Sequence, residues 1–431
     1  MPYPRDMAGA DPQHPTASIL LRLRGSAAPY LSVLFLATVI SVFVHYLVPL
    51  TPTIKGQALG VVSHFLLFGI AFVLWLIYQP GFRGGRLLGI FLGLAAIQWL
   101  TIMILGRIDQ ALFNYTALLY LPALAMIWWK PPRFPEVRFA MDVVAWALIA
   151  MSIASQVLDV AGLKAMNHEF VLRWPIMTDL FGVITRWEGP FGNVNYAGPI
   201  GAFLVVYGLC RTSWSRLAFV AAGVVILIAS EARTSFVATA VGVGVIFVFS
   251  PRIGRISIPA WLRIGSVGLG LLALVIVLVG PDSDLNSRTP LWSTYFALWQ
   301  TSPLDGVGES GIAQDINIGL IPGWASHAHS VYLDSLVRYG VIGLLTVLLT
   351  LTAGMWICVK AAHAGAPVGA ALLATFIVGG LTETIIDWRY LSIQGISMVA
   401  AVVLAAAWLR DRSGPHTRTH ADEEHQPSLT Q

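Results

Sequence analysis

The stretch SHAHSVYLDSLVRYGVIG, residues 326–343, decides how the rest of the chain is interpreted. It begins as a polar loop and is predicted to run without a break into a helix that enters a membrane. Asp334 and Arg338 form an i,i+4 acid–base pair on one face of that helix. An ionisable side chain at membrane depth is energetically costly and by default marks a pathway or a site. The alternative is a structural ion pair below an interfacial histidine.

The whole chain is strongly apolar. Of its 431 residues, 56% are hydrophobic and 11% are charged, which is more apolar surface than a soluble domain of this length requires. The composition therefore predicts an all-α polytopic membrane protein. Cys210 and Cys358 lie far apart, which favours neither a disulfide framework nor a zinc site. Basic residues are spread over short loops, so no nucleic acid partner is expected.

Apolar runs of the length that a bilayer requires predict about twelve transmembrane helices. The first run is too long for a signal-peptide core, so we interpret it as a retained helix. The block 217–250 is interrupted only near Glu231, which leaves one long helix as an alternative to two. The predicted spans are 27–50, 57–78, 86–105, 111–129, 139–163, 191–210, 217–232, 235–250, 261–280, 331–359, 366–386 and 391–409.

Lysine and arginine are unevenly distributed between the two sets of alternating loops. Most of the 26 fall on the side that also holds both chain ends, and the positive-inside rule assigns that side to the cytoplasm. Dropping one span would destroy this asymmetry, which favours an even number of spans. The pattern predicts a cytoplasmic tail over 1–26, a transmembrane domain over 27–410 with outer loops 164–190 and 281–330, and a disordered cytoplasmic tail over 411–431.

The second outer loop contains an amphipathic segment. Pro290 suits the first turn of a helix, and the spacing of the apolar residues predicts a short helix lying on the membrane surface. The large apolar residues that share one helical face are Leu291, Trp292, Tyr295, Phe296 and Trp299.

Three basic side chains are predicted to meet at the outer face. Arg233 lies between two apolar runs with no room for a loop, Arg288 begins the amphipathic helix, and His329 ends the same loop. Guanidinium binds phosphate and pyrophosphate through a planar fork of donors, and histidine suits proton transfer near neutral pH. The set fits transfer from a lipid-linked pyrophosphate donor. A simple ion pair between Arg233 and Glu231 is the alternative.

Four blocks, in this order, resemble the O-antigen ligase and O-antigen polymerase superfamily of polytopic glycosyltransferases. Two residues separate Ser230 from Arg233, whereas the family's Ser-Arg turn has none. The resemblance covers roughly 185–345, and the first half is similar only as generic membrane helices. The blocks are Trp187-Glu-Gly-Pro-Phe-Gly-Asn193-Val-Asn195-Tyr-Ala, Ser230-Glu-Ala-Arg233-Thr-Ser235, Asn286-Ser-Arg288-Thr-Pro-Leu-Trp292 followed by Ser302-Pro-Leu-Asp-Gly306-Val-Gly308, and His327-Ala-His329-Ser330 with Gly340-x-x-Gly343.

The resemblance implies a GT-C-like helical fold with its site on the outer face of the cytoplasmic membrane. The implied donor is a glycan on undecaprenyl pyrophosphate, the acceptor is a lipid, a glycan or a protein, and neither a metal nor another cofactor is required. Arg233 and Arg288 would bind the pyrophosphate, and His329 would activate the acceptor hydroxyl. Further candidate substrate-binding residues are Arg186, Asn193, Asn195, Trp292, Gly306, Gly308, His327 and Ser330, and candidate supporting residues are Asp334 and Arg338.

Several of these features also have simpler interpretations. His327 and His329 are spaced as a metal pair, but no third ligand is near them in the sequence. The glycine-rich segment 305–311 follows no strand, so a tight turn below the acceptor is favoured over a nucleotide-binding loop. Asn193 and Asn195 either cap the start of a helix or contact the glycan.

A cluster at the outer end of the eleventh span has two interpretations as well. Glu383 and the residues Asp387-Trp-Arg389 either contact sugars or form an ion pair that anchors the end of the helix. The residues alone do not choose between them.

Three functional alternatives remain beside a ligase. A polymerase would move a glycan chain onto another lipid-linked repeat. A transporter would also have many spans with buried charges, although transporters usually show related halves and this chain shows no clear internal repeat. An inert scaffold is disfavoured because Arg233, Arg288 and His329 are all present.

Overall fold

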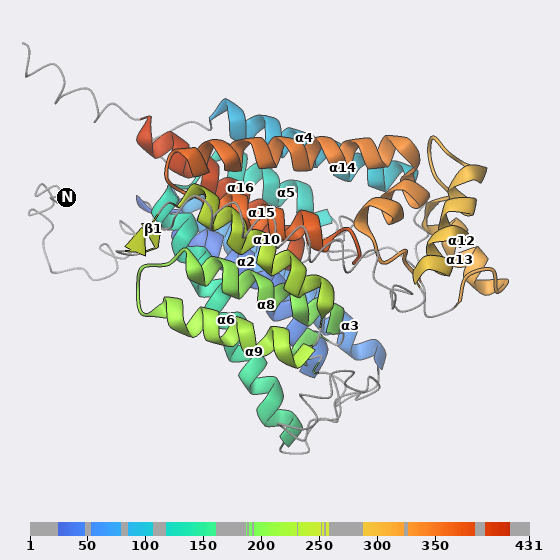
Figure 1. Ribbon diagram of the computed structural model, residues 1–431, viewed down its shortest axis with the longest axis horizontal. Coiled ribbons are helices and arrows are strands. Elements are labelled where there is room, and N and C mark those ends of the chain that lie inside the picture. Colours follow the sequence, from blue (N-terminus) through green and yellow to red (C-terminus); the bar gives the residue numbers. More distant parts are fainter. Residues whose placement is uncertain are drawn as a thin grey trace, which may run out of the picture.

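The protein is a bundle of helices in the computed structural model (Figure 1). The structure describes residues 25–47, 53–78, 85–106, 118–160, 187, 189–191, 194–230, 232–250, 252–253, 256–257, 288–322, 326–383 and 393–413. The bundle helices are α2 Ala28–Leu47, α3 Thr53–Ile77, α4 Arg86–Leu105, α5 Tyr120–Trp129, α6 Phe134–Val160, α8 Val194–Leu209, α9 Ser215–Ser230, α10 Arg233–Phe249, α14 Val331–His363, α15 Val368–Gly379 and α16 Ile393–Arg412. The smaller elements are the 3-10 turn η3 Gly189–Phe191, the helices α12 Arg288–Thr301 and α13 Gly308–Asn317, and the antiparallel strands β1 Arg252–Ile253 and β2 Ile256–Ser257.

The helices agree with the apolar runs of the sequence. Each predicted span contains a helix except 261–280, which lies outside the described residues. The helical fold is thus confirmed and is consistent with a polytopic membrane protein. Within the described part of the chain, 4 helices are long and apolar enough to cross a membrane, so the total of about twelve spans stays a prediction. The four are Arg86–Leu105, Phe134–Leu158, Val331–His363 and Gln394–Arg412.

The block 217–250 forms two helices, not one. α9 ends at Ser230, α10 begins at Arg233, and both pack against α8 (Figure 1). Glycine allows the close packing of α8 on α9, because a Cβ atom on Gly201 would lie 2.9 Å from the carbonyl oxygen of Gly223. The break therefore places Arg233 at the first position of a helix.

Cationic side chains tie several helix ends together at one end of the bundle, which we call the Lys130 end. Lys130 Nζ donates to the carbonyl oxygens of Trp75 and Tyr78, each at 2.6 Å. Arg410 donates to the carbonyl oxygen of Pro132 at 2.6 Å. The two Lys130 bonds satisfy carbonyl groups that the end of α3 leaves free, and the Arg410 bond attaches the end of α16 to the connection between α5 and α6. The predicted tails lie almost entirely in residues 1–24 and 414–431, outside the described residues.

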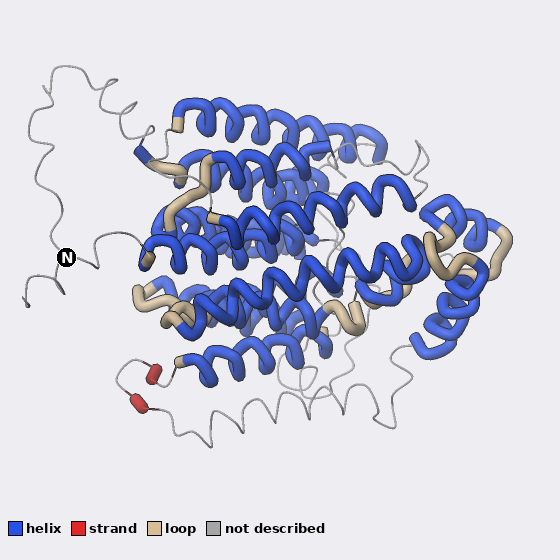
Figure 2. Tube along the Cα trace, turned by 90° about the horizontal axis from the view of Figure 1, so that it is seen from above, coloured by secondary structure: helices blue, strands red, loops and turns tan. Residues whose placement is uncertain are grey.

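The opposite end carries α12 and α13 (Figures 1 and 2), and we call it the His329 end. A small apolar core of its own joins the two helices to the start of α14. Leu291 and Tyr295 of α12 are buried in this core, whereas Phe296 is 46% exposed. The predicted apolar face of α12 is therefore divided between the protein core and the surface, and its position on a membrane stays a prediction. The buried members of this core are Leu291, Tyr295, Ile312, Ile321, Ala328 and Val337.

Candidate functional site

A break in α14 shapes the site, and the prediction of an uninterrupted helix is wrong at this point. Gly340 has φ +66° and ψ −167°, which is not helical. The backbone of Pro303 and Leu304 crosses the break and accepts hydrogen bonds from the amides of Val341 and Ile342, at 2.9 and 3.3 Å. A Cβ atom on Gly340 would collide with the carbonyl group of Leu304. Glycine is therefore required here for both its conformation and its size.

The segment that contains Gly306 and Gly308, just after the two residues that cross the break, also packs against the region of the break. We call this contact between residues 303–308 and the break the joint. Gly306 and Gly308 have φ of +73° and +74°. A Cβ atom on Gly306 would meet the backbone of Arg338, and the amide of Val307 donates to the carbonyl oxygen of Val337 at 2.9 Å. The glycine-rich segment around Gly306 and the segment around the break therefore pack together with their backbones in direct contact. Contact of Gly306 and Gly308 with a substrate stays a prediction.

Below the joint lies a buried cluster of charged and polar side chains, which we call the Arg338 cluster: Arg338, Asp334, Glu309 and Tyr339. Arg338 is 3% exposed and donates from Nε to Asp334 at 2.9 Å and from Nη1 to Glu309. The Tyr339 hydroxyl donates to the other oxygen of Glu309 at 2.9 Å. Buried charges require such partners. The i,i+4 pair predicted from the sequence is confirmed, and Glu309 is a third charged member that sequence reasoning missed.

The Arg338 cluster holds the loop that leads to α14. Arg338 Nη2 donates to the carbonyl oxygen of Ser326, and the amide of Ala328 donates to Asp334 at 3.0 Å. The indole of Trp292 donates to the carbonyl oxygen of Ala328 at 2.7 Å. Asp334 and Arg338 therefore hold the backbone of residues 326–328, next to His329, and their supporting role in a reaction stays a prediction.

His329 stands between this fixed loop and the helix. Its φ is +50°, which is uncommon for a residue other than glycine. Ser330 follows as the N-cap of α14 and accepts from the amide of Leu333 at 3.4 Å. The amide of Val331 donates to the carbonyl oxygen of Gly380 at 2.9 Å. The surrounding contacts thus fix a strained backbone at His329, as is often found at functional sites.

The imidazole of His329 is 14% exposed and lies close to a second histidine and a carboxylate. Its Nδ1 is 3.5 Å from Glu383 Oε2, and its ring centroid is 4.5 Å from that of His327. His327 Nδ1 lies 3.1 Å from the Ser326 hydroxyl. In the same small core, burial first and the nearby Asp334 second raise the pKa of Tyr295. Tyr295 is therefore a neutral phenol near pH 7 and not a candidate base.

The N-terminus of α10, which carries Arg233, lies beside the segment that carries Glu383. The Thr234 and Thr382 hydroxyl oxygens are 2.6 Å apart, so the residue before Glu383 contacts the residue after Arg233. The Arg233 side chain is exposed. The other interpretation of Arg233, an ion pair with Glu231, involves a residue that lies outside the described part of the chain.

The remaining predicted residues are only partly described. Asn195 lies in the first turn of α8 and is half-buried. Gly198, one turn later, packs so closely on Ala232 and Ser235 that a Cβ atom would not fit, so the starts of α8 and α10 lie together. Arg186, Asn193 and the side chain of Arg288 lie outside the described residues.

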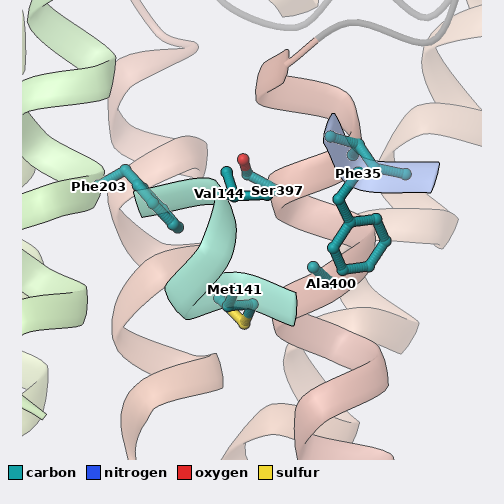
Figure 3. Close-up of a pocket in the computed structure, with 7 residues that line it drawn as sticks. Phe35, Met141, Val144, Phe203, Ser397 and Ala400 are labelled. Atoms are coloured by element: carbon teal, nitrogen blue, oxygen red, sulfur yellow. The ribbon is translucent and has the colours of Figure 1, made fainter. Parts of the chain in front are cut away.

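Two further features of the described ranges are their potential metal ligands and a cavity. These ranges contain no group of three or more His, Cys, Asp or Glu that could hold a metal ion, and metal independence stays a prediction. A cavity of about 10 Å³ lies inside the bundle (Figure 3), close to the lower limit for one water molecule. It contains no predicted site residue. Its lining is Phe35, Met141, Val144, Phe203, Ile396, Ser397 and Ala400.

The break at Gly340, the Arg338 cluster and His329 all lie in one stretch that a comparison with protein families recognises. Residues 217–348 match the O-antigen ligase family. The predicted resemblance to the O-antigen ligase and polymerase superfamily is confirmed over this stretch. The O-antigen ligase match supports an activity of that general kind, with a lipid-linked glycan and an acceptor as partners. It includes Arg233 and Arg288 and ends before Glu383. A comparison with curated proteins gives no match.

Proposed function

We propose that the protein is a membrane glycosyltransferase of the O-antigen ligase type. It moves a glycan from undecaprenyl pyrophosphate to an acceptor hydroxyl on the outer face of the cytoplasmic membrane, with both termini in the cytoplasm. The observation that carries the proposal is His329, which has a positive φ and is fixed by the Arg338 cluster within the matched residues 217–348. A reactive group requires such a rigid support.

The proposed reaction is a single displacement at the anomeric carbon. His329 takes the proton of the acceptor hydroxyl, the hydroxyl oxygen forms a bond to the anomeric carbon, and the bond from that carbon to the pyrophosphate oxygen breaks. The leaving pyrophosphate gains negative charge as the bond breaks. Arg233 and Arg288 stabilise that charge, because a guanidinium keeps its charge and offers several donors. The configuration of the sugar is inverted, and no metal takes part.

The proposed roles of the other residues follow their positions. Trp292, His327 and Ser330 lie in or against the loop that carries His329, and Asn195 lies near the start of α10. Each is proposed to border the glycan or the acceptor. Arg186 and Asn193 are proposed to contact the donor.

The test is complementation of a deletion strain. Wild type, Arg288→Ala and His329→Ala are expressed at matched levels, and the surface glycan and the undecaprenyl-linked pool are measured. We expect both variants to lose the surface product while long lipid-linked chains accumulate, which is the result for a ligase. Accumulation of single lipid-linked repeats would identify a polymerase instead. Two fully active variants would refute transfer by these residues and favour a transporter.

The proposed orientation has its own test. Gln314 on α13 and Ser413 after α16 are both exposed and lie at opposite ends of the bundle. Each is replaced by cysteine in a background in which Cys210 and Cys358 are serine. A membrane-impermeant maleimide is expected to label Gln314→Cys in intact cells and Ser413→Cys only after permeabilisation. The reverse pattern would place the His329 end in the cytoplasm and contradict the proposal.

A further inference from the structure

The carboxylate of Glu383 faces His329 from the segment that follows α15. Glu383 follows the end of α15 and is 7% exposed. Its Oε2 lies 3.5 Å from Nδ1 of His329. That nitrogen is buried and has no hydrogen-bond partner within the described part of the chain. A buried ring nitrogen beside a carboxylate at this distance is expected to form a hydrogen bond with it after a small shift, because leaving a buried donor without a partner is costly.

The relative position of the two side chains is set by the backbone on both sides. The amide of Val331, two residues after His329, donates to the carbonyl oxygen of Gly380 at 2.9 Å. The hydroxyl of Tyr332 donates to the carbonyl oxygen of Ile377 at 2.9 Å. The end of α15 is thus attached to the first turn of α14. The carboxylate and the imidazole are held together by two connections that do not involve either side chain.

A third connection brings in the helix that carries Arg233. The hydroxyl contact between Thr382 and Thr234 attaches the residue before Glu383 to the first turn of α10. One short segment therefore contacts α10, α14 and His329. Such a segment can keep a proton acceptor and a cation in fixed relative positions.

We propose that Glu383 is the positioning residue of His329. The carboxylate accepts a hydrogen bond from Nδ1–H and so leaves the lone pair of Nε2 free for the proton of the acceptor hydroxyl. When that proton has moved to Nε2, the ring is an imidazolium, and the carboxylate stabilises its charge. A carboxylate that orients a histidine base and stabilises its cation is a general device of acid–base catalysis. This inference rests on the function proposed above.

The experiment uses the purified full-length protein and a lipid extract of the deletion strain as the donor. Initial rates of glycan transfer are measured over a dilution series of the extract, which separates the maximal rate from the half-saturating amount. The variants are Glu383→Gln, which keeps the shape without the charge, and Glu383→Asp, which keeps the charge. Asp315→Asn is the matched control, because it removes an acidic charge from α13 at the same end of the bundle. Rates are expressed per monodisperse, folded molecule.

We expect Glu383→Gln to lower the maximal rate by at least about 10-fold, because losing the carboxylate that orients a histidine base removes stabilisation of the imidazolium. The half-saturating amount of extract stays within about two-fold, since the proposal gives Glu383 no contact with substrate. Glu383→Asp is expected to recover part of the rate, and Asp315→Asn to match wild type.

Three results would overturn the inference. One is a Glu383→Gln rate within about two-fold of wild type, because an unchanged rate means that no transition-state stabilisation was lost. Another is a raised half-saturating amount with an unchanged maximal rate, which would make Glu383 a binding residue. The third is a Glu383→Asp rate as low as that of Glu383→Gln. Failure of the proposed function has a different signature: wild type does not transfer glycan from the extract, or His329→Ala is as active as wild type.

Discussion

Two clusters of arginine, carboxylate and tyrosine lie at opposite ends of the bundle. Near the Lys130 end, Arg211 donates to Asp142 at 2.6 Å, and the Tyr207 hydroxyl donates to the other oxygen of Asp142 at 2.7 Å. This cluster, which we call the Arg211 cluster, joins the end of α8 to α6. It pairs one cation with one carboxylate. The Tyr207 hydroxyl also lies 3.0 Å from the carbonyl oxygen of Arg138, which is within α6, so the hydrogen bonds of this cluster join two neighbouring helices and hold no loop.

The Arg338 cluster uses the same residue types for a different purpose. It sets one arginine against two carboxylates, and it also binds the backbone of the loop before His329. The comparison teaches that the kind of residue does not decide the role. The backbone groups that a cluster holds decide whether it only stabilises the fold or also positions a reactive side chain.

The largest expected difference between the two clusters is the effect of losing the arginine. Arg338→Met leaves the Asp334 and Glu309 carboxylates buried without a cation, so we expect about 3–5 kcal/mol less stability and loss of transfer. Arg211→Met leaves Asp142 partly exposed and still bonded to Tyr207, so we expect about 1–2 kcal/mol. Its transfer rate per folded molecule is expected to stay unchanged. Thermal unfolding in detergent and the transfer assay check both values. Equal losses of transfer would remove the distinction.

The second largest effect is expected from a substitution in the joint at Gly340, next to the Arg338 cluster. Gly340→Ala forces an unfavourable φ and a collision with Leu304, so we expect a loss of more than about 2 kcal/mol and a strong loss of transfer. Gly93→Ala in α4 is the control, because a Cβ atom there meets nothing within 4 Å. It is expected to unfold at or above the wild-type temperature. A Gly340→Ala protein as stable and active as the control would show that the break is not required.

A single hydrogen bond to the loop sharpens the comparison further. Trp292→Phe removes the donor to Ala328, and we expect a loss of about 1 kcal/mol together with a several-fold lower transfer rate. Trp408→Phe is the matched control at the Lys130 end, where the indole donates to the carbonyl oxygen of Ala364 at 3.2 Å. Its stability is expected to fall by a similar amount, without a change in transfer rate per folded molecule. Reduced transfer in both variants would contradict the special role of the loop.

The smallest expected effect is that of the helix cap. Ser330→Ala removes a long N-cap hydrogen bond to Leu333, so we expect about 0.5 kcal/mol less stability. Transfer is expected to fall by no more than about five-fold, because the hydroxyl is proposed to border the substrate without taking part in the reaction. Ser330→Thr keeps an acceptor oxygen and should recover the difference in unfolding temperature. A large loss of transfer in Ser330→Ala would instead make the hydroxyl part of the reaction.

Local patterns in the sequence predicted much of the fold. Apolar runs gave the helices, and i,i+4 spacing gave the contact between Asp334 and Arg338. The order of the four sequence blocks predicted the family resemblance. Each of these signals lies within one segment of the chain or in the order of such segments.

The features that the sequence did not predict depend on contacts between distant segments. The break at Gly340 arises because Pro303 and Leu304 cross the helix there. Glu309 and Glu383 meet Arg338 and His329 only in the folded chain. The only local sign of a role for Glu309 is that it is an acidic residue in a glycine-rich segment. That sign does not indicate that its partner is Arg338.

The most direct measurement is the transfer rate of His329→Ala beside that of His363→Ala. His363 lies at the other end of α14, is exposed, and packs edge-on against Phe249, so it controls for the loss of a histidine. The account predicts that His329→Ala loses at least about 100-fold in rate per folded molecule, as expected for removal of a general base. His363→Ala is predicted to keep the wild-type rate. Equal rates for the two variants would contradict the central claim that the His329 end carries the reaction.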